Sequence, residues 1–153
     1  MRLTQLTDYA MRLLIHVAQH PQRVCTIREV AARYQLSQAH LMKITHRLGR
    51  AGWLTTTRGK GGGIRLARRP EEIGLGAVVR SMEPDFEIVE CFATGSSCML
   101  TGTCRLTAVM DGALRGFFEH LDRHTLADIL PAPAGTPTQH VIGIEPPRAA
   151  AAR

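Results

Sequence analysis

Three cysteines lie close together in one segment, with six residues between Cys91 and Cys98 and five between Cys98 and Cys104. The residues between them are mostly small or polar and include two glycines, so the backbone can curl around a bulky inorganic group and offer N–H donors to its sulfurs. Thiolates are the ligands that iron–sulfur clusters take in proteins. The spacing therefore indicates a soft-metal or iron–sulfur site.

Three other interpretations of these cysteines remain open. Tetrahedral zinc sites usually contain ligand pairs separated by two to four residues, and no two cysteines of this chain have that spacing. Disulfides are possible for four cysteines, but the chain is expected to have no signal peptide and to be cytoplasmic, where thiols stay reduced. The three thiols could also lie in a loop without binding any metal, although three cysteines within fourteen residues is a dense group. Cys25, outside this group, is expected to be a buried or inert thiol.

Charge is divided unevenly along the chain. Residues 1–69 hold thirteen Lys and Arg against two acidic residues, a net charge of +11, whereas residues 70–153 hold six Arg against eleven acidic residues, a net charge of −5. A basic half joined to an acidic half is expected when one part docks on phosphates and the other has a different task. The longest apolar run, within residues 13–18, is too short to span a bilayer, so no membrane partner is expected.

Periodic apolar residues predict three helices at the start of the basic half. The first begins near Leu6 and stops before Pro21, and the second opens with a capping box formed by Thr26 and Glu29. Ser37 is expected to cap a third helix with an apolar inner face. The residues of this third helix predicted to meet DNA are Ser37, Gln38, His40 and Lys43. This pattern is typical of a helix-turn-helix whose second helix enters the major groove, with double-stranded operator DNA as partner.

A hairpin is predicted directly after the third helix. Residues 53–57 and 64–67 have strand character, and the turn at 58–63 carries Arg58 and Lys60 among four glycines. Such a tip can approach a phosphate chain closely or insert a side chain into the minor groove. Arg58 and Lys60 are therefore candidate DNA contacts, although a glycine-rich basic hairpin can also be a simple surface loop.

The acidic half is predicted to hold a short helix over 74–82, the cysteine loop and then the longest helix of the chain. The apolar stripe of this longest helix includes two Phe and three Leu, while Asp111 and Arg115 can pair on the opposite face. Because so wide a stripe exceeds what a winged-helix domain can cover, a helix of a second subunit is expected to pack on it. Packing against the first helix of the same chain is the alternative.

The predicted fold class is therefore mainly α-helical, with a winged helix-turn-helix, a cysteine-bearing cluster loop and a long dimerisation helix. The expected domains are a DNA-binding domain over residues 1–69 and a region over 70–130 that contains the linker helix, the iron–sulfur loop at 88–104 and the dimerisation helix. Residues 131–153, with five prolines, are expected to form a flexible tail.

Four features of the sequence together resemble a known family. They are residues 7–10 at the start of the first helix, Ser37, Leu41 and Lys43 in the third, the basic glycine-rich turn and the three-cysteine loop. Over about residues 1–130 the chain resembles the dimeric winged-helix iron–sulfur transcription regulators, and within them the branch of nitric-oxide-sensing repressors. The conjunction of the four features carries the resemblance, since a helix-turn-helix with a wing is not specific by itself.

The resemblance implies a ligand set. In this family three loop cysteines bind the cluster, which matches Cys91, Cys98 and Cys104, and in the nitric-oxide-sensing branch an aspartate on the first helix of the partner subunit can be the fourth ligand, which matches Asp8. The branch that regulates cluster biogenesis uses a histidine three residues after its last cysteine, where this chain has Thr107. A 4Fe-4S cluster is favoured. The first cysteine gap is one residue longer than the commonest pattern, so a 2Fe-2S cluster is the alternative.

The resemblance also implies a signal. The expected protein is a homodimeric repressor that releases operator DNA when nitric oxide nitrosylates the cluster, and a redox-sensing or iron-status-sensing regulator of the same family is the alternative. As an iron ligand, the hard oxygen of Asp8 among soft thiolates would be displaced readily by a diatomic molecule. Asp8 could instead only stabilise the start of its helix, where a carboxylate favours the helix dipole.

Two other classes of function find little support. An enzyme would need an acid–base arrangement, and the seven histidines of the chain are scattered without a catalytic motif. A ferredoxin-like electron carrier would need four-cysteine runs, which this sequence does not have, and would have no use for the strongly basic half.

Overall fold

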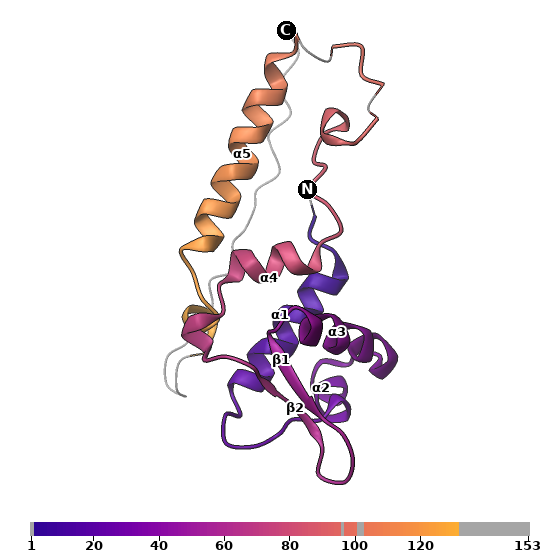
Figure 1. Ribbon diagram of the computed structural model, residues 1–153, viewed down its shortest axis with the longest axis vertical. Helices are drawn as coiled ribbons and strands as arrows, with labels where there is room; N and C mark the ends of the chain where they lie inside the picture. The colour runs from indigo at the N-terminus through magenta and orange to yellow at the C-terminus, as the bar shows by residue number, and fades with distance from the viewer. Residues whose placement is uncertain (1, 96, 101–102, 132–153) are drawn as a thin grey trace, which may run out of the picture.

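The computed structural model describes residues 2–95, 97–100 and 103–131 and forms a winged helix-turn-helix from which one long helix extends (Figure 1). The predicted tail, apart from Pro131, lies outside the described residues. The helices and strands, in chain order, are α1 (Gln5–Ala18), α2 (Ile27–Tyr34), α3 (Gln38–Arg50), β1 (Leu54–Thr57), β2 (Gly63–Leu66), α4 (Leu75–Met82) and α5 (Arg105–Asp122). Short 3-10 helices lie at Pro70–Glu72, Glu90–Phe92 and Ala127–Ile129.

Local capping residues define the first helices. Thr4 caps α1 by accepting a hydrogen bond from the backbone N–H of Thr7, and Thr26 caps α2 by accepting one from the N–H of Glu29. The Glu29 carboxylate stays next to Thr26, whose hydroxyl donates to it over 3.4 Å, and it also accepts hydrogen bonds from His16 and Arg23. Gln35 then adopts a left-handed conformation, with φ of 54°, and turns the chain sharply into α3.

One hydrophobic core holds the basic half and part of the acidic half together. The largest fully buried side chains come from α1, α3, α4 and the segments around them: Leu13, Leu14, Leu41, Ile44, Leu48, Ile73, Met82 and Leu126. The predicted inward face of α3 is confirmed. Leu126 reaches this core from beyond α5, and an isolated bridge between Gly74 and Thr125 fixes its position. The end of α5 is therefore anchored on the winged-helix core.

The wing is a two-stranded antiparallel hairpin in which Leu54 pairs with Leu66 and Thr57 with Gly63. Cys25 extends it on one side, since its N–H donates to the carbonyl of Ile64 over 3.0 Å and its own carbonyl accepts from the N–H of Ile64 over 2.7 Å. The segment between α1 and α2 is thus hydrogen-bonded to the wing.

The long helix α5 packs against α4 and extends away from the winged-helix core (Figure 1). Arg80 of α4 donates two hydrogen bonds to Asp122, at 2.6 and 2.8 Å, and its guanidinium lies over the ring of Phe118. In this chain no residue of α5 is buried, and Leu106 and Val109 are 57% and 65% exposed. The predicted pair of Asp111 and Arg115 forms at 2.8 Å. The first part of the apolar stripe is thus left uncovered by the chain itself, whereas Phe117 and Phe118 farther along are half-buried.

No helix within residues 2–95, 97–100 and 103–131 is both long enough and apolar enough to cross a membrane.

Replacing Gly63 by Ala is expected to destabilise the fold by about 1–3 kcal/mol, because the new Cβ would collide with the backbone carbonyl of Cys25. The bridge between Cys25 and Ile64 would have to open. Gly112→Ala on α5 is the control: nothing lies near its Cβ position, and alanine should stabilise this helix by about 0.5–1 kcal/mol. Chemical denaturation of both variants measures the difference. Equal midpoints would show that the wing tolerates a side chain at Gly63.

Candidate functional site

The predicted recognition residues lie at the exposed start and outer face of α3. Ser37 occupies the N-cap position without a side-chain capping bond, and Gln38 and Lys43 are exposed. His40 is half-buried, with its ring edge-on to that of Tyr9 in α1 at a centroid distance of 5.7 Å. Three of the four side chains are therefore free of the core, whereas His40 also contacts α1.

Further basic residues of α3 extend this surface. A groove of about 510 Å³ runs along the helix and is lined by Lys43, His46, Arg47, Arg50, Ala51 and Ser81. Arg47 and Arg50 were not among the predicted DNA contacts. Helical periodicity alone could have found them, since they lie on the same face of the helix as Lys43. The groove gives α3 a continuous row of hydrogen-bond donors suited to phosphates.

The hairpin tip carries the two predicted wing residues. Arg58 and Lys60 are exposed, and Gly59 and Gly61 have positive φ values of 94° and 78°. Residues with side chains rarely adopt this conformation, so the glycines permit the tight tip that presents the two cations.

The three loop cysteines have distinct local positions. Cys91 lies in the 3-10 helix Glu90–Phe92, Cys104 is the N-cap residue of α5, and both are half-buried, as is Cys98 between them. Within the described part of the chain no cysteine forms a disulfide. The Sγ of Cys91 lies 3.4 Å from Oγ1 of Thr107.

The structure does not draw the three loop thiols into a tight group. Among the described residues, three potential ligand atoms lie within 4.8 Å of one another only at His16, His20 and Cys25. A cluster of several iron atoms holds its thiolates farther apart than a single ion does. The wide spacing of the loop thiols therefore does not argue against a cluster, and the chemical types of the donors decide whether the loop suits one.

Asp8 is exposed in the first turn of α1, where Arg12 is its partner. The two side chains form an ion pair at 2.8 Å, with the Asp8 side chain 48% exposed. Such an exposed pair contributes little stability. The N-cap of α1 is tied to the end of α4, since both the N–H and the hydroxyl of Thr4 donate to Oε1 of Glu83, the C-cap residue of α4.

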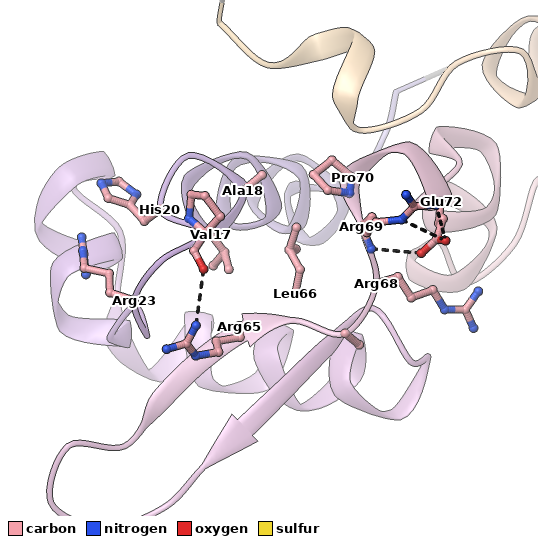
Figure 2. Close-up of a pocket in the computed structure, with 12 residues that line it drawn as sticks. Val17, Ala18, His20, Arg23, Arg65, Leu66, Arg68, Arg69, Pro70 and Glu72 are labelled. Atoms are coloured by element: carbon pink, nitrogen blue, oxygen red, sulfur yellow. Dashed lines mark hydrogen bonds and ion pairs between the residues drawn. The ribbon is translucent and has the colours of Figure 1, made fainter.

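A basic cavity of about 440 Å³ lies between the end of α1, β2 and the Pro70–Glu72 turn (Figure 2). It is lined by four arginines, Arg23, Arg65, Arg68 and Arg69. Each has a partner in the protein: these are, in that order, Glu29, the Pro21 carbonyl, the Trp53 ring and Glu72. The guanidinium groups therefore serve internal contacts.

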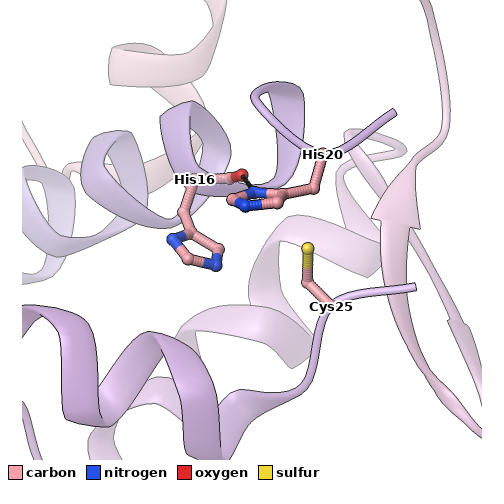
Figure 3. Close-up of side chains that lie close together, drawn as sticks. All are labelled: His16, His20 and Cys25. Carbon is pink, nitrogen blue, oxygen red and sulfur yellow. Dashed lines mark hydrogen bonds between the residues drawn. The ribbon is translucent and has the colours of Figure 1, made fainter. Parts of the chain in front are cut away.

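The cluster of His16, His20 and Cys25 lies beside this cavity and was missed by the sequence analysis, apart from the expected burial of Cys25 (Figure 3). Burial, followed by a hydrogen bond to Glu29, raises the pKa of Cys25 to about 11, so the thiol keeps its proton at neutral pH. Burial alone would raise the pKa of Glu29, but hydrogen bonds from His16, Arg23 and Cys25 outweigh it and lower the pKa to about 2.

Comparison with known proteins gives consistent relatives. A family model described as Rrf2, iron-dependent transcriptional regulator, matches residues 3–132. The HTH-type transcriptional regulator NsrR of Geobacillus kaustophilus is 46% identical over 132 residues, which is 85% of this chain and 90% of that protein. NsrR of Bacillus subtilis is 45% identical over the same shares of both chains.

Solved structures show the same fold. IscR of T. potens superposes with a TM-score of 0.67 at 25% identity, covering 84% of this chain and 85% of that one. CymR, the global cysteine regulator of B. subtilis, gives a TM-score of 0.64 at 23% identity and covers 84% and 95%. The predicted mainly α-helical winged-helix fold and the family resemblance are thereby confirmed. The chain belongs to the Rrf2 family of transcriptional regulators and is a DNA-binding regulator of the NsrR type, not an enzyme.

Proposed function

We propose that this regulator is an iron–sulfur-dependent repressor that holds operator DNA as a homodimer and releases it in response to nitric oxide. The observation that carries the proposal is the position of three cysteines without disulfides, Cys91, Cys98 and Cys104, in a loop that follows α4. The C-cap residue of α4, Glu83, is hydrogen-bonded to Thr4, the N-cap residue of α1, four residues from Asp8. These contacts would connect the cysteine loop to the DNA-binding helices.

The donor set of the loop suits an iron–sulfur cluster. Three half-buried thiols supply soft ligands, and Gly95, with φ of 83°, allows the backbone to turn tightly between the first two. Cys104 would hold its thiolate against the positive end of α5. A 4Fe-4S cluster is proposed, with a 2Fe-2S cluster as the alternative. When bound, the cluster would supply an iron site that reacts with nitric oxide.

Asp8 of the partner subunit is proposed as the fourth ligand. Its carboxylate is exposed and paired only with a neighbour on the same helix, Arg12, so exchange of that partner costs little. A carboxylate is the hardest donor in the set and the one most easily displaced. This bond would tie the DNA-binding helices of one subunit to the loop of the other.

Contacts around Asp8 provide a route to the recognition helix. Arg12, its partner, also lies 5.7 Å from the centre of the Tyr9 ring, and Tyr9 packs edge-on against His40 of α3. A change at Asp8 would alter the position of Arg12 and Tyr9 and, through His40, that of α3. The operator-bound and the released states of the regulator would differ in these contacts. A coupling between two sites requires such a difference.

The homodimer would form through α5. Its exposed apolar residues, including Leu106 and Val109, would pack on the same helix of a second copy. Two copies would present two α3 helices and two hairpins to half-sites about one or two helical turns apart. Proposed DNA contacts are Ser37, Gln38, His40 and Lys43 in α3, and Arg58 and Lys60 in the wing.

Anaerobic titration of the operator complex with nitric oxide tests the proposal. The visible absorption of the cluster and the operator-bound fraction are expected to decline over the same range of nitric oxide, while oxygen or mild peroxide acts more slowly. Asp8→Ala should still assemble a cluster on three thiolates but should bind the operator more weakly. An operator complex indifferent to nitric oxide would refute the signal and leave a redox or iron-status sensor as the function.

A further inference from the structure

Three side chains that DNA binding does not use converge at the end of α1. His16 and Cys25 are buried, His20 is half-buried, and one potential ligand atom from each lies within 4.8 Å of the other two (Figure 3). Imidazole nitrogen and thiolate sulfur are the donors that zinc and similar divalent ions prefer. The three residues come from two segments, since Cys25 follows the turn after α1.

The hydrogen bonding of His20 prepares it as a ligand. Its Nδ1 lies 2.8 Å from the backbone carbonyl of His16, and because a carbonyl can only accept, Nδ1 carries the hydrogen. In the neutral ring Nε2 then holds the free electron pair. Metal-bound histidines commonly donate their other ring N–H to a carbonyl or carboxylate in this way. His20 is half-buried and also lines the 440 Å³ cavity, so part of its side chain is accessible to solvent.

Glu29 is the carboxylate next to the cluster. Its Oε1 accepts a hydrogen bond from Nε2 of His16 over 3.1 Å. An ion held by both atoms would take the place of the shared hydrogen, which His16 would release or move to Nδ1. Atoms bound to zinc at about 2.1 Å lie about 3.4 Å apart along the edge of a tetrahedron, so the ligand atoms of His16, His20 and Cys25, which lie within 4.8 Å of one another, would have to close by side-chain rotation. The carboxylate also brings negative charge to the cluster.

We propose that His16, His20 and Cys25, with Glu29 as the fourth ligand, bind one divalent transition-metal ion of the zinc class at a site separate from the cysteine loop. The ion would join three elements: α1 and the turn after it through His16 and His20, the first turn of α2 through Glu29, and the wing through Cys25, which is hydrogen-bonded to Ile64 of β2. Binding would release the thiol proton of Cys25 to solvent and would stabilise the base of the wing.

Titration with Co²⁺ of the untagged full-length chain, with Cys91, Cys98 and Cys104 replaced by Ser to remove competing thiols, tests the site. One Co²⁺ per chain is expected to bind with a thiolate-to-cobalt charge-transfer band, and Zn²⁺ should abolish the band by displacement. Zn²⁺ should also raise the thermal midpoint of this protein. Failure to bind a stoichiometric ion would overturn the proposal.

Three further substitutions in that background assign the ligands. Cys25→Ser should remove the charge-transfer band, and His20→Ala should weaken Co²⁺ binding at least about 10-fold, as loss of one ligand does. His120→Ala, on exposed α5, should bind as the parent does. If Cys25→Ser fails to fold, His20→Ala decides the matter, since its half-exposed side chain can be removed with little loss of core packing. A band that survives Cys25→Ser, or unchanged affinity in His20→Ala, would contradict the site.

Discussion

Single replacement of Cys91, Cys98 or Cys104 by Ala is expected to abolish the visible absorption of the anaerobically purified protein and its specific binding to operator DNA. A cluster held by three loop thiolates cannot lose one without losing its site, and operator affinity should fall to the non-specific level, about 10³-fold or more. Absorption spectra and operator titration at fixed salt measure both effects. Non-specific binding should persist, because the basic residues of α3 and the wing are unchanged.

Cys25→Ala is the matched control for the loop cysteines. Cys25 is fully buried beneath α1 and belongs to a different segment, so in buffer without added divalent metal the variant should leave both the cluster absorption and operator binding nearly intact. Equal loss from all four substitutions would show a general need for thiols and would contradict a binding loop formed by these three.

Alanine substitutions in α3 and the wing are expected to weaken DNA binding in two different ways. Arg58→Ala or Lys60→Ala should reduce affinity for all sequences and lower the dependence on salt by about one counterion, as loss of a phosphate contact does. Gln38→Ala or Lys43→Ala should cost about 1–3 kcal/mol on the operator and relax its sequence preference. Operator and scrambled duplexes titrated over a range of salt separate the two effects.

Arg115→Ala is the control for these DNA contacts. It removes the same charge as Arg58→Ala, but its side chain pairs with Asp111 on α5, away from α3 and the hairpin. Its operator affinity should therefore stay near that of the parent. If substitutions in both α3 and the wing leave binding unchanged, the assignment of the DNA-binding surface is wrong.

The elements of the fold were determined largely by local sequence. Thr4 and Thr26 each cap a helix by accepting a hydrogen bond from the free N–H three residues later in the chain. Such a bond involves only neighbouring residues, so it forms without help from the rest of the protein. The inner face of α3 follows from helical periodicity in the same way. The wing was predicted from its glycines and strand residues, with three of the four strand boundaries displaced by one residue. Cysteine spacing indicated a candidate cluster loop, which remains a prediction.

Contacts between residues that are far apart in the sequence became apparent only in the tertiary structure. Glu29 was predicted to cap its helix together with Thr26, but folding also brings His16 and Arg23 to its carboxylate, which accepts hydrogen bonds from both. The link between Thr4 and Glu83 joins residues 79 positions apart, and no sequence period encodes it.

The same reason explains why the cluster of His16, His20 and Cys25 was missed by sequence analysis. The two histidines are four residues apart, yet they become potential ligands only because the turn after α1 carries Cys25 back beneath them. Its pairing with Ile64 of β2 then holds it there. Local residue types determine helices and turns, whereas a site built from separate segments depends on how the whole core packs.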